Sequence, residues 1–281
     1  MSNGGDDVTS VGRGAQDAHR KPVTAARLYD YYLGGIHNFP ADREVAKVLL
    51  ERTPKLRTIA RDNRAFLARA VRYLMSVGVH QFLDIGSGIP TEGNVHEIVQ
   101  AVAPDARVVY VDIDPHAVSE SLELLEGNQF ATAIRADVRE PQAILDHPRV
   151  RGLLDFDQPI ALLLVAVLHF VEDSDEVRDI VTTFRSALAP GSHLVVAHAT
   201  IDELIVDERR WEKTQKDYRQ QTTTSLVPRK KSDVVRFFDG FEMVEPGLVW
   251  LNAWRPEPDM VDEFKDEPER SSFYVGVGRL P

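Results

Sequence analysis

The 281-residue chain contains no cysteine, which excludes disulfides, zinc–thiolate centres and thiol nucleophiles. It also lacks a long apolar segment. The longest apolar run, Ile160–Phe170, is interrupted by His169 and is too short to span a bilayer. Residues 1–17 are polar and glycine-rich, without the apolar stretch of a secretory signal. We therefore expect a cytoplasmic protein with no membrane partner.

Positive charge is also scarce, because the formal net charge is −11 at pH 7. An acidic chain is a poor electrostatic match for a polyanion, so no nucleic-acid partner is expected. The one basic cluster, Arg229, Lys230 and Lys231, is typical of a solvated loop. The length and a hydrophobic content of 43% allow one large α/β domain with extra helices, or at most two small domains.

The chain divides into three regions by composition and periodicity. Residues 1–20 are rich in Gly, Asp and Ser, which predicts a disordered tail. Residues 21–80 carry apolar side chains at helical spacing and predict an N-terminal helical cap. Residues 81–281 alternate between strand and helix patterns, with a polar helical insertion expected at about 200–235.

The alternation predicts an α/β fold with a doubly wound, mostly parallel, Rossmann-like sheet. Predicted strands fall at 81–85, 108–111, 131–134, 160–167 and 193–197. Predicted helices lie between them, at 94–102, 115–125, 141–145 and 177–188. Two further strands, 243–251 and 273–277, predict an antiparallel C-terminal hairpin at the sheet edge.

The loop after the first predicted strand, Asp84–Thr91, is the most informative segment. Gly86 and Gly88 allow a tight turn and a close approach of the backbone to a ligand just before a helix begins. Dinucleotides and S-adenosylmethionine are both bound by such loops. A dinucleotide fingerprint requires Gly or Ala where this chain has Thr91.

Acidic residues around this loop favour S-adenosylmethionine. Asp84 would repel a pyrophosphate at close range, whereas it would attract the sulfonium and ammonium groups of S-adenosylmethionine. Asp112 ends the second strand, 24 residues after Gly88, where a carboxylate can accept both ribose hydroxyls. A third acid, Asp137, follows the third strand.

These segments resemble the motifs of class I S-adenosylmethionine-dependent methyltransferases. Phe82–Gly88 is similar to motif I, and Val109–Pro115 and Ala136–Arg139 are similar to the motifs after the second and third strands. Ala26–Gly35, followed by His37-Asn38-Phe39, resembles an actinobacterial methyltransferase family long classified only as a domain of unknown function. The resemblance extends from about residue 20 to the end and implies the fold and the cofactor.

The loop chemistry and the resemblance together give a set of candidate cofactor-binding residues. Asp84 would hold the ammonium, Asp112 the ribose hydroxyls and Asp137 the adenine amino group. The full set is Tyr29, Tyr32, Gly34, Asp84, Gly86, Ser87, Gly88, Asp112, Ile113, Asp137, Val138 and Ala166. Tyr29 and Tyr32 are equally consistent with core positions of the cap. Asp114 is interpreted as the cap of the following helix rather than as a second ribose ligand.

The sequence indicates a methyltransferase that acts on an oxygen or nitrogen atom of a small molecule. It does not identify this acceptor. His169, after the fourth strand, is a candidate general base, although a packing role is favoured. Pro90 stands where motif I commonly has a third glycine, which leaves open a non-catalytic protein that binds S-adenosylmethionine or S-adenosylhomocysteine. An NAD-dependent oxidoreductase is disfavoured by Asp84 and Thr91. No metal site and no particular oligomeric state are expected.

Overall fold

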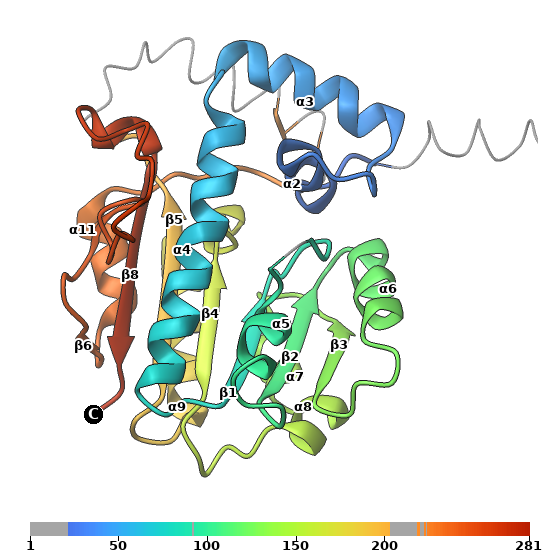
Figure 1. The fold of residues 1–281 in the computed structure, drawn as a ribbon, viewed down its shortest axis with the longest axis vertical. Coiled ribbons are helices and arrows are strands. Elements are labelled where there is room, and N and C mark those ends of the chain that lie inside the picture. The colour runs from blue at the N-terminus through green and yellow to red at the C-terminus, as the bar shows by residue number, and fades with distance from the viewer. Residues whose placement is uncertain (1–21, 92, 203–217, 220–221, 223) are drawn as a thin grey trace, which may run out of the picture.

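A twisted sheet with helices on both faces forms the centre of the computed structural model (Figure 1). The structure describes residues 22–91, 93–202, 218–219, 222 and 224–281. The predicted tail, 1–20, and half of the predicted helical insertion lie outside the described residues. Within this part of the chain, no helix has the length and apolar character needed to cross a membrane.

The parallel part of the sheet has the strand order β3-β2-β1-β4-β5. These strands are β1 (Gln81–Ile85), β2 (Arg107–Asp112), β3 (Ala131–Arg135), β4 (Ala161–Val165) and β5 (His193–Ala199). The last strand, β8 (Phe273–Arg279), pairs antiparallel with β5. The predicted doubly wound, mostly parallel sheet with an antiparallel C-terminal addition is thereby confirmed.

Side-chain alternation along the strands divides the core into two layers. On β1, Phe82 packs with α4 (Leu56–Ser76), α5 (Val95–Gln100) and α6 (Pro115–Leu124). Leu83 and Ile85 point to the opposite face. The helices on that face are α7 (Pro141–Leu145), α8 (Pro148–Leu153), α9 (Ser174–Ala187) and α11 (Lys231–Val234), with the short 3₁₀ segments η1 (Leu168–Phe170) and η2 (Val235–Phe238). Asp84, two residues after Phe82, therefore belongs to the α4–α5 side.

The first two described helices cover the carboxyl ends of the strands (Figure 1). They are α2 (Ala25–Leu33) and α3 (Pro40–Arg52), and α2 ends at Gly34 in the left-handed conformation that glycine adopts without strain. Leu28 and Ala46 form a small core between them with Tyr218. Helix α4, which also falls within the predicted cap region 21–80, packs along the face of the sheet.

The C-terminal segment differs from the sequence prediction in one respect. Instead of one strand over 243–251, two short strands, β6 (Glu242–Met243) and β7 (Val249–Trp250), pair with the same edge of β8. Pro246 has no N–H for the ladder, and Gly247 has a φ of 87°, so the strand is interrupted between them. A further 3₁₀ turn, η3 (Pro268–Ser271), precedes β8.

Candidate functional site

The order of the strands locates the expected ligand site. In a doubly wound sheet, ligands bind outside the carboxyl ends of the strands, where the strand order reverses. In this sheet β1 lies between β2 and β4, so the reversal is at β1. The glycine loop follows β1 directly and lies beside the ends of β2 and β4.

Two glycines in this loop have positive φ for different reasons. Gly86 has a φ of 73°, and a Cβ added there would lie 2.5 Å from Cγ2 of Val167. Gly88 has a φ of 69°, but a Cβ there would meet no atom within 4 Å. The backbone at Gly86 is thus packed against the protein, whereas Gly88 borders open space.

This difference predicts unequal effects of two matched substitutions. Both Gly86→Ala and Gly88→Ala incur the left-handed backbone cost of about 1–2 kcal/mol. Gly86→Ala adds an overpacking cost of about 1–3 kcal/mol against Val167. Urea denaturation should therefore show a clearly larger loss of unfolding free energy for Gly86→Ala. Equal losses would mean that Val167 moves aside without cost.

Asp112 links the glycine loop to the end of β2. Its side chain is buried and accepts hydrogen bonds of 2.8 Å from the backbone N–H groups of Gly88 and Asp114. Burial raises the pKa of Asp112 to about 6, and the amide donors oppose that rise. Asp114 accepts from the N–H of His116 and caps α6, which confirms its interpretation as a helix cap.

Asp84 is a buried carboxylate at the end of β1. It is 4% exposed, and within the described part of the chain no hydrogen bond or ion pair reaches its oxygens. Burial raises the pKa of Asp84 to about 7, while the positive charge of Arg64 lowers it and the charge of Asp112 raises it further. A buried acid left in this state fits a ligand that brings a positive charge.

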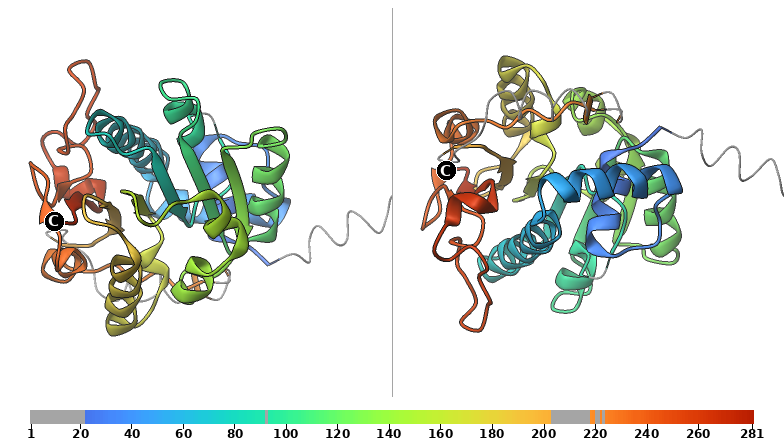
Figure 2. Two further views of the ribbon diagram at one scale, coloured as in Figure 1. Left: turned by 90° about the horizontal axis from the view of Figure 1, so that it is seen from below. Right: turned by 90° about the horizontal axis from the view of Figure 1, so that it is seen from above.

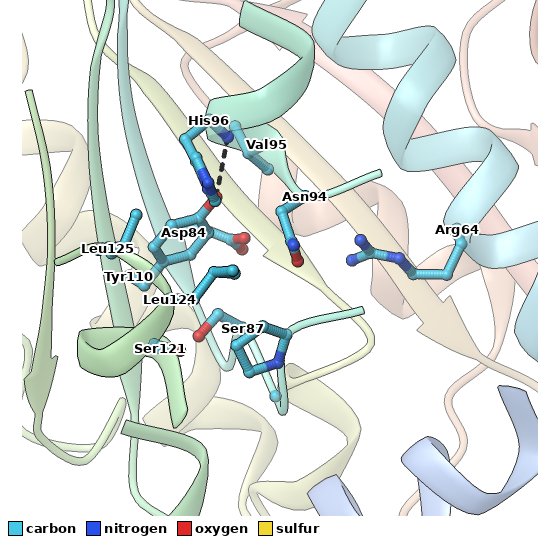
Figure 3. Close-up of a pocket in the computed structure, with 12 residues that line it drawn as sticks. Arg64, Asp84, Ser87, Asn94, Val95, His96, Tyr110, Ser121, Leu124 and Leu125 are labelled. Atoms are coloured by element: carbon cyan, nitrogen blue, oxygen red, sulfur yellow. Dashed lines mark hydrogen bonds between the residues drawn. The ribbon is translucent and has the colours of Figure 1, made fainter. Parts of the chain in front are cut away.

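Asp84 faces a cleft between the glycine loop and helices α4, α5 and α6 (Figure 3). The volume of the cleft is about 290 Å³, part of which is open to solvent. Three side chains point toward its centre. Asp84 extends from β1, Asn94 from the N-cap of α5, and Arg64 from α4. Ser87 and Gly88 also line the cleft. Asp84, Ser87 and Gly88 therefore share this cleft, and Asp112 is joined to the same loop by its hydrogen bond from Gly88.

Arg64, Tyr110 and Asn94 also line this cleft and were not among the candidate site residues predicted from the sequence. Arg64 lies on α4, before the motif, and nothing in its local sequence indicates a site. Tyr110 lies inside β2, and its hydroxyl is 2.8 Å from both the backbone nitrogen and Nδ1 of His96. Asn94 had a readable signal, because Asn94 and Glu97 form a capping box at the start of α5.

The residues after β2 and β3 lie farther from this cluster. Ile113 is half exposed, and Val138 packs against the core on the α9 side. Asp137 accepts two 3.0 Å hydrogen bonds from Nε of Arg139. Although burial raises the pKa of Asp137, the hydrogen bonds and charge of Arg139 lower it overall. An adenine amino group at Asp137 would have to share the carboxylate with Arg139.

The segment after β4 is tightly constrained. Ala166 has a φ of 60°, which ends β4 earlier than expected, and its N–H donates to the carbonyl of Ala197 in β5. His169 is buried, and its Nδ1 accepts from the N–H of Ala199 at 3.3 Å. Burial, reinforced by His198 and Arg229, lowers the pKa of His169 well below its usual value. A neutral, engaged imidazole of this kind fits the packing role.

The tyrosines of the cap are engaged within the protein. The Tyr29 hydroxyl donates to the carbonyl of Ala60 and accepts from Asn63, each at 2.9 Å. Tyr32 packs against the small core that contains Tyr218, and burial raises its pKa. These contacts fit the core positions that the sequence left open as an alternative.

The strand order and the acid-flanked glycine loop define the Rossmann-like class of S-adenosylmethionine-dependent methyltransferases. Comparison with known proteins agrees. The chain matches the S-adenosyl methyltransferase family over residues 13–281 and belongs to that family. Its cofactor is accordingly S-adenosylmethionine. A comparison with curated protein sequences gave no match.

Two solved structures are similar over almost their whole lengths. A protein of Thermobifida fusca YX, provisionally assigned as a methyltransferase, shares 40% identity with a TM-score of 0.85, covering 98% of this chain and 99% of that one. A DUF574 family protein from Streptomyces avermitilis shares 36% identity with a TM-score of 0.86, covering 94% and 100%. The CurJ carbon methyltransferase, at 16% identity and a TM-score of 0.52 over 98% of this chain and 72% of that one, shows the fold alone.

Proposed function

We propose that this enzyme methylates an oxygen or nitrogen atom of a small molecule. The observation that carries the proposal is the cluster of Asp84, Gly88 and Asp112 beneath a helical cap. Helices α2 and α3 lie over the carboxyl ends of the strands (Figure 1), and we expect them to hinder a bulky acceptor from approaching. The net charge of −11 also disfavours a nucleic-acid acceptor.

The proposed roles divide the cofactor among several backbone and side-chain groups. Asp84 holds the ammonium group, and Arg64 balances the charge of Asp84 before binding. Asp112 accepts the ribose hydroxyls while it remains bonded to Gly88. The backbone from Gly86 to Gly88 lies against the amino-acid end. Ile113, Val138 and Ala166 would surround the nucleoside.

Methyl transfer mainly requires that the acceptor atom be aligned with the methyl group of S-adenosylmethionine. S-adenosylmethionine supplies an electrophilic methyl group on a positively charged sulfur. The acceptor atom forms the new bond to this carbon as the carbon–sulfur bond breaks, and the electron pair stays on sulfur. The acceptor proton leaves to water. Because the departing sulfur is neutral, the protein contributes chiefly proximity and orientation. This fits the environment of His169, which is buried and neutral.

Transfer of labelled methyl groups tests the proposal. The pure protein would be incubated with methyl-labelled S-adenosylmethionine and a cell extract divided by ultrafiltration into small molecules and macromolecules. We expect label in the small-molecule fraction, absent in a Gly88→Ala control whose added Cβ enters the open space at the loop. Label confined to protein or nucleic acid would contradict the proposed acceptor. Cofactor binding without any transfer would favour the non-catalytic alternative that Pro90 raises.

A further inference from the structure

Two histidines and a glutamate from two segments meet where the cap borders α6. His37 lies between α2 and α3, whereas His116 and Glu120 lie on α6. Nδ1 of His37 is 2.9 Å from Oε2 of Glu120, and Nδ1 of His116 is 3.6 Å from Oε1 of the same carboxylate. One ligand atom from each residue lies within 4.8 Å of the other two.

These separations are near those of metal ligands around a common centre, with each histidine facing a different oxygen of Glu120. Bonds of about 2.0–2.1 Å in tetrahedral directions place neighbouring ligand atoms roughly 3.4 Å apart. The two observed separations, 2.9 and 3.6 Å, lie on either side of this value. We propose that His37, His116 and Glu120 form a zinc-binding site.

The ligand types select the metal. Imidazole nitrogen with one carboxylate suits Zn²⁺, whereas Mg²⁺ prefers oxygen ligands in an octahedral arrangement. Three protein ligands leave the fourth tetrahedral position for water. A set of two histidines and one acidic residue is complete for such a site, so no further side chain is required.

The three side chains are both accessible and held in place. Their side chains are 40%, 27% and 24% exposed for His37, His116 and Glu120, so an ion can reach them from solvent. The ring of Phe39 lies 5.4 Å from that of His116, and the His116 backbone is fixed by Asp114. His116 and Glu120 share one face of α6 because they are four residues apart.

The metal would fasten the cap to the sheet domain. Seen from above, the blue α2–α3 segment lies beside the green α6 (Figure 2). Arg27 of α2 already bonds to Asp114 at the start of α6. Zinc at His37 would add a second connection between the same two segments, close to the loop that carries Asp112.

Zinc titration of the full chain, prepared without a polyhistidine tag and stripped with a chelator, tests the site. Competition with a chromogenic chelator would give the Kd, and Co²⁺ absorption would report the coordination geometry. We expect one equivalent of Zn²⁺ and no competition by Mg²⁺. His37→Gln and His116→Gln should each weaken binding by at least about tenfold.

His80→Gln provides the matched control, because His80 is exposed and, within the part of the chain that the structure describes, only its backbone carbonyl takes part in a hydrogen bond. This variant should bind zinc like the parent protein. Circular dichroism of each variant would verify that the fold is retained. Equal zinc uptake by the parent and a His37→Gln/His116→Gln double variant would overturn the proposal, as would Co²⁺ absorption typical of six oxygen ligands.

Discussion

Asp84→Asn is expected to weaken the binding of S-adenosylhomocysteine by roughly 10- to 100-fold at pH 8. The substitution keeps the shape of the side chain but removes the charge that the ammonium group requires. A hydrogen bond to a charged group is worth about 1.5–3 kcal/mol, and each 1.4 kcal/mol corresponds to a factor of ten in Kd. Isothermal titration calorimetry measures the effect directly.

The same substitution should change the pH dependence of binding. The pKa of Asp84 is raised to about 7 in the free protein, so its carboxylate is increasingly protonated below that pH. The parent protein should therefore bind more weakly at pH 6 than at pH 8, since the cation needs the ionised acid. In Asp84→Asn most of this dependence should disappear, leaving only the weaker contribution of Asp112, whose pKa is about 6.

The contribution of Asp84 to the unfolding free energy of the ligand-free protein should fall as the pH rises, whereas its contribution to ligand affinity rises. Burial raises the pKa of Asp84 above the value of about 3.9 in an unfolded chain, so its favourable contribution is complete below pH 4 and is lost as the pH rises through 7. Asp84→Asn should consequently stabilise the free protein at pH 8, by up to about 4 kcal/mol. Exposed Asp157→Asn is the control and should change neither quantity. A destabilised Asp84→Asn protein with unchanged affinity would refute this account of Asp84.

Arg27→Met is expected to cost about 3–5 kcal/mol of unfolding free energy, the loss typical of breaking a buried ion pair from one side. Arg27 is 4% exposed and bonds at 2.9 Å to both Asp42 and Asp114, which are also buried. Its removal would leave two acids without their cation. Urea denaturation of the parent and the variant gives the difference.

Two further variants test the cause of that loss. Arg43→Met is the matched control in the same cap, because among the described residues Arg43 donates only to the backbone and side-chain oxygens of Asn38. It should cost about 1 kcal/mol. Adding Asp114→Asn to Arg27→Met should recover part of the stability by removing one uncompensated charge. A double variant no more stable than Arg27→Met alone would show that packing, rather than charge, dominates at Arg27.

The sequence predicted what depends on contiguous residues. The run from Phe82 to Gly88 specifies a strand followed by a glycine turn, and Asp114 before Pro115 specifies a helix cap, so both were found locally. Because side chains alternate along a strand, the same run also sets the face on which Asp84 lies.

Features made by distant segments could not be predicted in the same way. Arg27 looks like one surface arginine among many until the fold places it between Asp42 and Asp114. His37 carries no ligand pattern of its own, because its partners are on α6. The hydrogen bond from Arg139 to Asp137 joins residues that are close in sequence. It nevertheless depends on the side-chain conformation of Arg139, which the spacing of residues does not determine.

The hydrogen bond from Gly88 to Asp112 has a consequence for how tightly a nucleoside is bound. Two backbone amides hold the Asp112 carboxylate in one orientation before any ligand arrives. The Asp112 side chain then loses little rotational freedom when the ligand binds, so a larger part of the free energy of its contacts contributes to affinity. A substitution that loosens the turn would weaken capture even if every ligand-contacting side chain were retained.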